Sequence, residues 1–361
     1  MPNSDPKPPS RFRRALGAVG RAVLLPVQGA GYLVRSGKAH QHFFLPVLNG
    51  ALGDQLAARL DPRAIRLSFR RGGYDVGVAD LRLSEPHQKT VIFIHGLMRD
   101  ELIWQTGFQD LPDTRRYGPR LAEEGQLRTL YLRFNSGLHL SENGRELSRM
   151  LTELVETYPD AIGELVLVGH SMGGLIIRSA GYYATPTPTV SGAAPAPWLA
   201  HLRSVFLIGT PNDGSWLEQN SHLTARLLHR IGLFPTRFLS KALNQRSNGI
   251  KDMRYSILVD EDWQDAHADD LTPPRTAVPA LPGVHYHILM GAWLRATRPA
   301  ALREYFGDGL VGQGSARGAA TFGDQAALPA GASVRTAVFS QQHHGGLLTH
   351  PAVFQYLRQW V

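Results

Sequence analysis

A short apolar stretch that leads directly into a glycine-flanked serine constrains this chain more than any other feature. Leu165-Val166-Leu167-Val168 is followed by Gly169-His170-Ser171-Met172-Gly173-Gly174 and then by the apolar Leu175-Ile176-Ile177. A strand, a Gly-x-Ser-x-Gly turn and a helix in this order predict a sharp turn that exposes the serine hydroxyl. The flanking glycines would let the strand and the helix pass closely. Ser171 is therefore the predicted nucleophile.

A serine hydroxyl is a poor nucleophile at neutral pH, so it needs a histidine base and donors for the oxyanion. One donor is expected from an earlier strand end, where Thr90-Val91-Ile92-Phe93-Ile94 runs into His95-Gly96-Leu97. We assign the N–H of Leu97 and that of Met172, the residue after the nucleophile, to the oxyanion hole. His95 is expected to brace this loop, because the base should lie near the C-terminus.

Two neighbouring histidines follow the last predicted strand, Ser333 to Phe339. His343 and His344 lie on the loop where the general base is expected, and adjacent loop residues point in different directions. Only one of them can therefore reach Ser171. The residues alone do not choose between the two.

The acid of the triad should lie between the nucleophile and the histidine. Asp308, in Gly307-Asp308-Gly309, follows the strand-like segment Val284 to Met290 and meets this condition. Asp260 and Asp262 also meet it, since they follow the strand-like Tyr255 to Leu258. We favour Asp308, whose role would be to orient the histidine and stabilise the imidazolium.

These segments together resemble the α/β-hydrolase superfamily, and within it the lipase and esterase branch that also includes inositol-deacylase-like proteins. The resemblance implies that Asp-Gly-x-Val carries the acid and that His-x-x-Leu-Leu carries the base. These match Asp308 and His344, so His344 is preferred to His343. The similar stretches are Ile92 to Leu97, Gly169 to Gly174, Leu207 to Ser215, Gly307 to Val311 and His344 to Pro351.

The order of apolar segments predicts an α/β fold with a mostly parallel central sheet flanked by helices. An antiparallel pair, Ile65 to Phe69 and Tyr74 to Leu83, would open the sheet, with Gly72-Gly73 as its turn. The parallel strands would include Val91 to Ile94, Leu130 to Phe134, Leu165 to Val168 and Val205 to Ile208, and helices would cover Ser141 to Tyr158 and Pro351 to Trp360.

We expect an N-terminal extension over residues 1–60 and a hydrolase domain over residues 61–361. The alternation of strands and helices breaks at about residues 215–280. An insertion there would lie above the carboxyl ends of the strands, so we interpret it as a helical cap or lid lining the acyl pocket. The alternative is a peripheral helical hairpin without contact to substrate.

The composition sets further limits. The chain has 361 residues and no cysteine, which excludes disulfides and metal–thiolate sites. The net charge of +8 comes from scattered arginines, without the basic stripe or module of a nucleic-acid-binding protein. We therefore expect no nucleic-acid partner, and the proposed chemistry needs neither a metal nor an organic cofactor.

The N-terminal segment Ala15 to Val34 is mostly apolar, but Arg21 and Pro26 interrupt it. A spanning helix needs about 20 predominantly apolar residues, and a signal peptide needs an uncharged apolar core. The segment should instead pack on the domain or lie on a membrane surface, and we favour packing. We expect a cytoplasmic protein, with peripheral membrane association through this segment as the alternative.

The sequence thus predicts a serine hydrolase that cleaves carboxylic esters of lipid or acyl type through an acyl-enzyme. An acyltransferase could use the same triad, passing the acyl group to an alcohol. From a different class, a lipid-binding or interaction protein that has lost activity would keep the same residues.

Overall fold

A mixed sheet forms the centre of the part of the chain that the computed structural model describes, residues 44–106, 116–186, 194–214, 247–264, 275–293, 307–308, 310–323 and 327–361. Within these residues the sheet has eight strands in the order β2-β1-β4-β3-β5-β6-β7-β8. The strands are β1 Ser68–Arg71, β2 Tyr74–Val76, β3 Gln88–Ile94, β4 Arg128–Arg133, β5 Ile162–His170, β6 Leu202–Ile208, β7 His285–Ala292 and β8 Ser333–Ser340.

Among these eight strands, β1 alone runs against the direction of the others. It pairs antiparallel with β2 and with β4, and the turn between β1 and β2 uses the left-handed glycines Gly72 and Gly73, with φ of 59° and 87°. All other neighbouring strands, from β4 to β8, pair in parallel. The carboxyl ends of β3, β5, β6 and β7 therefore meet at one edge of the sheet, where ligands bind in open α/β sheets.

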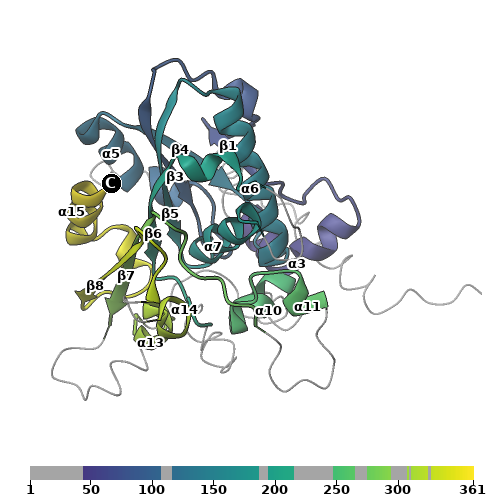
Figure 1. Cartoon of the computed structure of the whole chain (residues 1–361). Helices are drawn as coiled ribbons and strands as arrows, with labels where there is room; N and C mark the ends of the chain where they lie inside the picture. Colours follow the sequence, from purple (N-terminus) through teal and green to yellow (C-terminus); the bar gives the residue numbers. More distant parts are fainter. Residues whose placement is uncertain are drawn as a thin grey trace, which may run out of the picture. The chain divides into compact units, whose positions relative to one another are not determined.

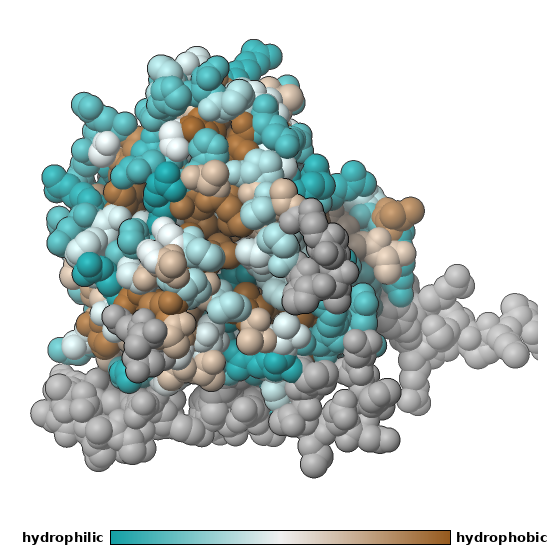
Figure 2. Space-filling view, in the orientation of Figure 1, coloured by the Kyte–Doolittle hydropathy of each residue, from teal (hydrophilic) through white to brown (hydrophobic). Residues whose placement is uncertain are grey.

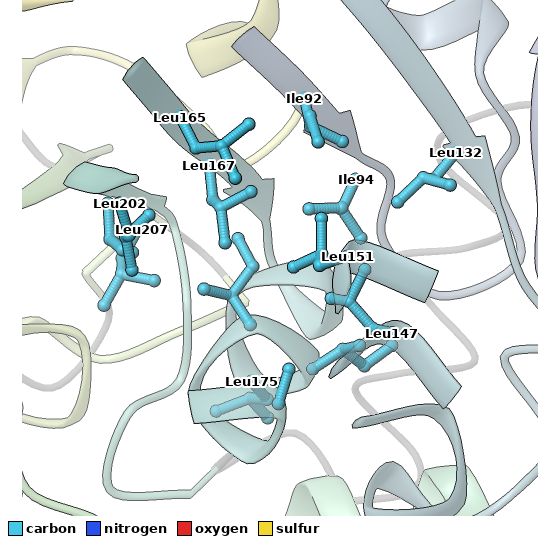
Figure 3. Close-up of a cluster of buried hydrophobic side chains, with 14 of the residues drawn as sticks. Ile92, Ile94, Leu132, Leu147, Leu151, Leu165, Leu167, Leu175, Leu202 and Leu207 are labelled. Atoms are coloured by element: carbon cyan, nitrogen blue, oxygen red, sulfur yellow. The ribbon is translucent and has the colours of Figure 1, made fainter. Parts of the chain in front are cut away.

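Helices cover both faces of the sheet (Figure 1). α6 (Leu140–Thr157) and α7 (Met172–Ala184) pack on one face, and α5 (Tyr117–Gly125) and α15 (Pro351–Trp360) pack on the other. Because side chains alternate along a strand, Ile92 and Ile94 enter the core on the α6 side, whereas Val91 and Phe93 enter the opposite core. Figure 3 shows part of the first core, with leucines of β5 and β6 directed towards those of α6 and α7.

Further helices surround this frame. They are helices α3 (Leu45–Ala58), α4 (Leu102–Gln105), α10 (Asn248–Tyr255), α11 (Glu261–Gln264), α13 (Gln313–Arg317) and α14 (Ala319–Phe322), and 3-10 helices at Val78–Leu81, Pro197–Ala200 and Gly346–Leu348. The face of the molecule in Figure 2 is mainly hydrophilic, with apolar side chains visible between the hydrophilic ones. Within the described residues, none of the helices is long and apolar enough to cross a membrane.

The predicted fold class is confirmed, and most predicted strands and helices are found where the periodicity placed them. Two predictions about local structure were wrong. The second strand of the opening pair ends at Val76, and Val78–Leu81 is a 3-10 helix. The segment Tyr255 to Leu258 is not a strand, because Ser256 terminates α10 in a left-handed conformation with φ of 54°.

Several predictions fall largely outside the described residues. The apolar segment Ala15 to Val34 lies outside them, as do residues 215–246 and 265–274 of the expected cap. The helix α3 of the expected N-terminal extension is described, and it belongs to the same compact unit as the sheet, His42–Val361. The domain boundary at residue 60 and the cap remain predictions.

Candidate active site

Ser171 stands at the turn between β5 and α7, immediately after the carboxyl end of β5. Its backbone has φ of 54° and ψ of −123°, a conformation that favours glycine and that an L residue adopts only under strain. The surrounding structure holds it there, since the N–H of Ser171 donates to the carbonyl of Ile208 at the end of β6 over 2.9 Å. α7 begins at Met172, so the positive end of the helix dipole lies at the serine.

The glycines around Ser171 are needed because the backbones approach closely. A Cβ on Gly169 would stand 2.6 Å from the backbone nitrogen of Gly174. A Cβ on Gly173 would stand 2.4 Å from the carbonyl oxygen of His95. Any larger residue would therefore push α7 away from β5 or from the loop after β3.

His344 and Asp308 form a hydrogen-bonded pair in the interior. The Nδ1 of His344 lies 2.7 Å from Oδ2 of Asp308, and the side chains are only 9% and 2% exposed. The main-chain N–H of His344 also donates to the carbonyl of Asp308 over 3.0 Å. The histidine is thus tied to the aspartate at both its ring and its backbone.

The second carboxylate oxygen of Asp308 is also occupied. Oδ1 accepts the N–H groups of Leu310 and Val311, at 3.0 and 2.8 Å. The residue before the aspartate is fixed as well, because the carbonyl of Gly307 accepts the N–H of Trp293 over 2.7 Å. These contacts leave Oδ2 directed at His344.

The pair lies close to the serine turn. The imidazole rings of His170 and His344 are 4.6 Å apart between centroids, and Nε2 of His170 lies 3.3 Å from the carbonyl oxygen of His344. Gly209, just after β6, lies against the pair on another side, where an added Cβ would be 3.0 Å from Nδ1 of His344. The ends of β5 and β6 and the loops after β7 and β8 therefore bring Ser171, Asp308 and His344 to one region.

The rival candidates lie elsewhere or face away. His343 is exposed, and its Nδ1 accepts the N–H of Gly346 over 3.1 Å. Asp260 pairs with Arg145 of α6. Asp262 accepts both the N–H and the hydroxyl of Thr276, at 2.8 and 2.7 Å.

The loop after β3 lies against Ser171. An added Cβ on Gly96 would stand 3.1 Å from Cβ of Ser171, so the backbone next to Leu97 is in contact with the nucleophile. Within the described residues, neither the N–H of Leu97 nor that of Met172 donates a hydrogen bond. Both amides, which the sequence assigned to the oxyanion hole, are therefore placed beside the serine turn without an acceptor in the described part of the protein.

His95 orients the amide of Leu97 by holding the carbonyl of the same peptide group. Its Nε2 lies 3.2 Å from the N–H of Phe134 and must accept that hydrogen, so Nδ1 carries the proton and donates to the carbonyl of Gly96 over 2.8 Å. That carbonyl and the N–H of Leu97 belong to the same planar trans peptide and point in opposite directions. His95 is thus a brace of the loop, as the sequence predicted.

Burial keeps two histidines of the site neutral. It lowers the pKa of His95, which is fully buried, from 6.5 to about 4. Burial also holds the pKa of His170 well below 6.5, and a positive charge on the neighbouring His344 would lower that pKa further. His170 therefore places no second positive charge beside the ring of His344. The sequence had given His170 no role, because its contact with His344 depends on the fold.

The described residues contain no group of three or more His, Cys, Asp or Glu side chains arranged to hold a metal ion. The groups that the geometry brings together are a hydroxyl, an imidazole, a carboxylate and two backbone amides.

The chain belongs to the alpha/beta hydrolase family, whose model matches residues 91–354. Among solved structures it is similar to the mature lipase BlEst2 of Bacillus licheniformis, with 18% identity and a TM-score of 0.45 over 77% of this chain and 94% of that chain. It is also similar to Staphylococcus hyicus lipase, with 12% identity and a TM-score of 0.41 over 76% and 93% of the two chains. A Pyrococcus furiosus esterase gives 12% identity and a TM-score of 0.42 over 75% and 79%. Curated proteins gave no match.

Proposed function

We propose that this protein is a serine hydrolase of carboxylic esters, with Ser171, His344 and Asp308 as its triad. The observation that carries the proposal is the buried His344–Asp308 pair, whose ring lies beside the turn that bears Ser171. Family membership supports a hydrolase, and the geometry supports the assignment of roles.

In the proposed reaction, Oγ of Ser171 attacks the ester carbonyl carbon while Nε2 of His344 accepts its proton. The carbonyl π electrons move to oxygen, and the N–H groups of Leu97 and Met172 hold this oxyanion. Collapse of the intermediate breaks the bond to the alcohol, which leaves with the proton from His344. A water molecule, deprotonated by His344, then releases the acid from the acyl-enzyme.

Asp308 has two functions in this scheme. It keeps the proton of neutral His344 on Nδ1, so that Nε2 is free to accept the proton of the serine, and it stabilises the imidazolium that results. The carboxylate does not itself take the proton. The amides of Leu310 and Val311 hold it in the orientation that this requires.

We propose esters of apolar acyl groups as substrates, with lipid esters included. A series of p-nitrophenyl esters from acetate to palmitate would measure the preferred acyl length.

The nucleophile is tested by intact mass after treatment with a fluorophosphonate, followed by peptide mapping, on wild type, Ser171→Ala and His344→Ala. A single adduct on Ser171 that both variants lose is the expected result. An adduct elsewhere, or none on folded wild type, would refute the proposal.

A further inference from the structure

The residue after Leu97 has an unusual backbone. Met98 has φ of 56°, and it occupies the third position of a turn in which the N–H of Arg99 donates to the carbonyl of Gly96 over 3.3 Å. This position of a turn with positive φ normally takes glycine or asparagine. A methionine there is strained by about 1–2 kcal/mol, so contacts from the surroundings must hold the conformation.

One of these contacts comes from the loop after β4. The N–H of Met98 donates to Oγ of Ser136 over 3.1 Å, and Ser136 is almost fully buried. The neighbouring Asn135 fixes this loop, since its Oδ1 accepts the N–H of Gly137 over 3.0 Å and its Nδ2 donates to the carbonyl of Gly53 in α3 over 3.1 Å. The hydroxyl of Ser136 is therefore held in a defined position beside the turn.

The second contact comes from α3, a helix that lies outside the segment matched by the family model. Gly50 faces the turn so closely that an added Cβ would stand 2.3 Å from Cγ of Met98 and 3.2 Å from Oγ of Ser136. The side chain of Met98 packs in a small apolar cluster with Leu48, Ala51 and Leu52 of the same helix. α3 thus covers both members of the Met98–Ser136 hydrogen bond.

α3 is itself anchored in the fold. Asn49 accepts the N–H of Ile65 over 2.8 Å and donates to the carbonyl of Arg63 over 2.8 Å. Ser247 lies just before α10, and its hydroxyl donates to the carbonyl of Gly50 over 2.6 Å. α3 and α10 lie side by side (Figure 1). The helix is therefore a fixed support and not a loosely attached one.

We propose that Ser136, in the loop after β4, and Gly50, in α3, are positioning residues for the oxyanion hole. They clamp Met98 in its strained conformation and thereby fix the adjacent Leu97 amide, which His95 orients from the other side. The proposal rests on the proposed function, because it concerns the same transition state. Under this proposal α3 helps to position the oxyanion hole, although the sequence analysis assigned this segment to an N-terminal extension.

The test compares Ser136→Ala with Ser136→Thr and with the matched control Ser148→Ala. Ser148 is also buried and accepts an N–H over 3.1 Å, from Trp198, on the α6 side of the sheet. Each variant is assayed for kcat and KM on a short p-nitrophenyl ester and for inhibition by a trifluoromethyl ketone, whose adduct carries the oxyanion. Thermal unfolding is recorded in parallel.

Ser136→Ala should lower kcat about 10- to 100-fold with KM changed less than twofold, because the donor is displaced and not removed. The inhibition constant of the ketone should rise by the same factor, and the pH at half-maximal rate should not move. Ser136→Thr keeps the hydroxyl and should restore most of the rate. Ser148→Ala should keep kcat within twofold of wild type.

A second variant guards against a folding defect in Ser136→Ala. Gly50→Ala adds a methyl that helices favour, so it should not unfold α3, yet it should displace Met98 and lower kcat in the same way. Wild-type kcat and ketone inhibition in both Ser136→Ala and Gly50→Ala would overturn the inference and leave the proposed hydrolase intact. If wild type itself is not labelled at Ser171, the proposed function fails, and this inference fails with it.

Discussion

Asp308 holds His344 through two separate hydrogen bonds, one from the ring Nδ1 at 2.7 Å and one from the backbone N–H at 3.0 Å. The carboxylate accepts the first of these bonds and the main-chain carbonyl of Asp308 accepts the second. The backbone bond fixes where the histidine loop lies, and the ring bond fixes which nitrogen carries the proton. A substitution that changes only the side chain of Asp308 should therefore alter the rate of catalysis and leave the backbone bond that supports the fold in place.

Asp308→Asn preserves the shape of the side chain and removes its charge. The amide cannot stabilise the imidazolium, and it would favour the wrong tautomer of His344, so kcat for ester hydrolysis should fall by about 10⁴ while the melting temperature changes little. Asp260→Asn is the matched control, because Asp260 pairs with Arg145 and was the rival acid. A large loss of rate in Asp260→Asn but not in Asp308→Asn would move the acid to that cluster.

Gly209 tests how tightly the His344–Asp308 pair is packed. It has φ of 58°, and an added Cβ would lie 3.0 Å from Nδ1 of His344 and 3.2 Å from Oδ2 of Asp308. Gly209→Ala should lower kcat by about 10²-fold, since displacing a catalytic group by as little as about 1 Å costs that much.

Gly72→Ala is the control for backbone strain. Gly72 has φ of 59°, almost the same value, but an added Cβ there would meet no atom of the described residues within 4 Å apart from its own chain neighbours. Backbone strain should cost both variants about 1 kcal/mol of stability, and Gly72→Ala should keep the wild-type kcat. Equal activity of the two variants in a p-nitrophenyl ester assay would show that the pair tolerates displacement.

The sequence was sufficient for the parts of the site that depend on local pattern. The apolar strand before Gly169 and the helix after Ser171 define the turn without help from the rest of the chain. Short continuous apolar runs likewise predicted most of the parallel strands, because a strand of a parallel sheet is buried on both faces.

The remaining features depend on contacts between distant segments. The residues favoured Asp308 over Asp260, but an Asp-Gly pair alone is commonly only a turn, and the contact of Asp308 with His344 depends on the fold. The strand predicted at Tyr255 to Leu258 failed because Ser256 ends α10 in a left-handed conformation, which its residue type does not signal. No local signal links Ser136 to Met98, 38 residues earlier.

The buried histidines predict how stability depends on pH. The pKa values of His95 and His287 are both lowered from 6.5 to about 4, mainly by burial. The unfolded chain therefore binds more protons than the folded one between about pH 6.5 and pH 4, so the free energy of unfolding falls as the pH drops through this range. Each histidine accounts for about 3 kcal/mol over the full range.

His287 is the better residue for testing this, because it packs against Phe206 and Tyr356 and takes no part in the proposed reaction. His287→Phe should make the plot of unfolding free energy against pH less steep between pH 6.5 and pH 4, as measured by urea denaturation at several pH values. The same slope in wild type and variant would mean that His287 is protonated as readily in the folded state as in the unfolded one.

The strain at Ser171 can be measured with two variants that are both expected to be inactive. Ser171→Ala keeps the Cβ in a backbone conformation, φ 54° and ψ −123°, that favours glycine, whereas Ser171→Gly removes it. Although glycine loses more entropy on folding, relief of the strain should make Ser171→Gly the more stable of the two by about 1 kcal/mol in urea denaturation. Ser179, within α7, gives the opposite control, because alanine is favoured over glycine in a helix interior by about 1 kcal/mol. If Ser171→Gly proved less stable than Ser171→Ala, as expected at Ser179, then the turn would store no strain.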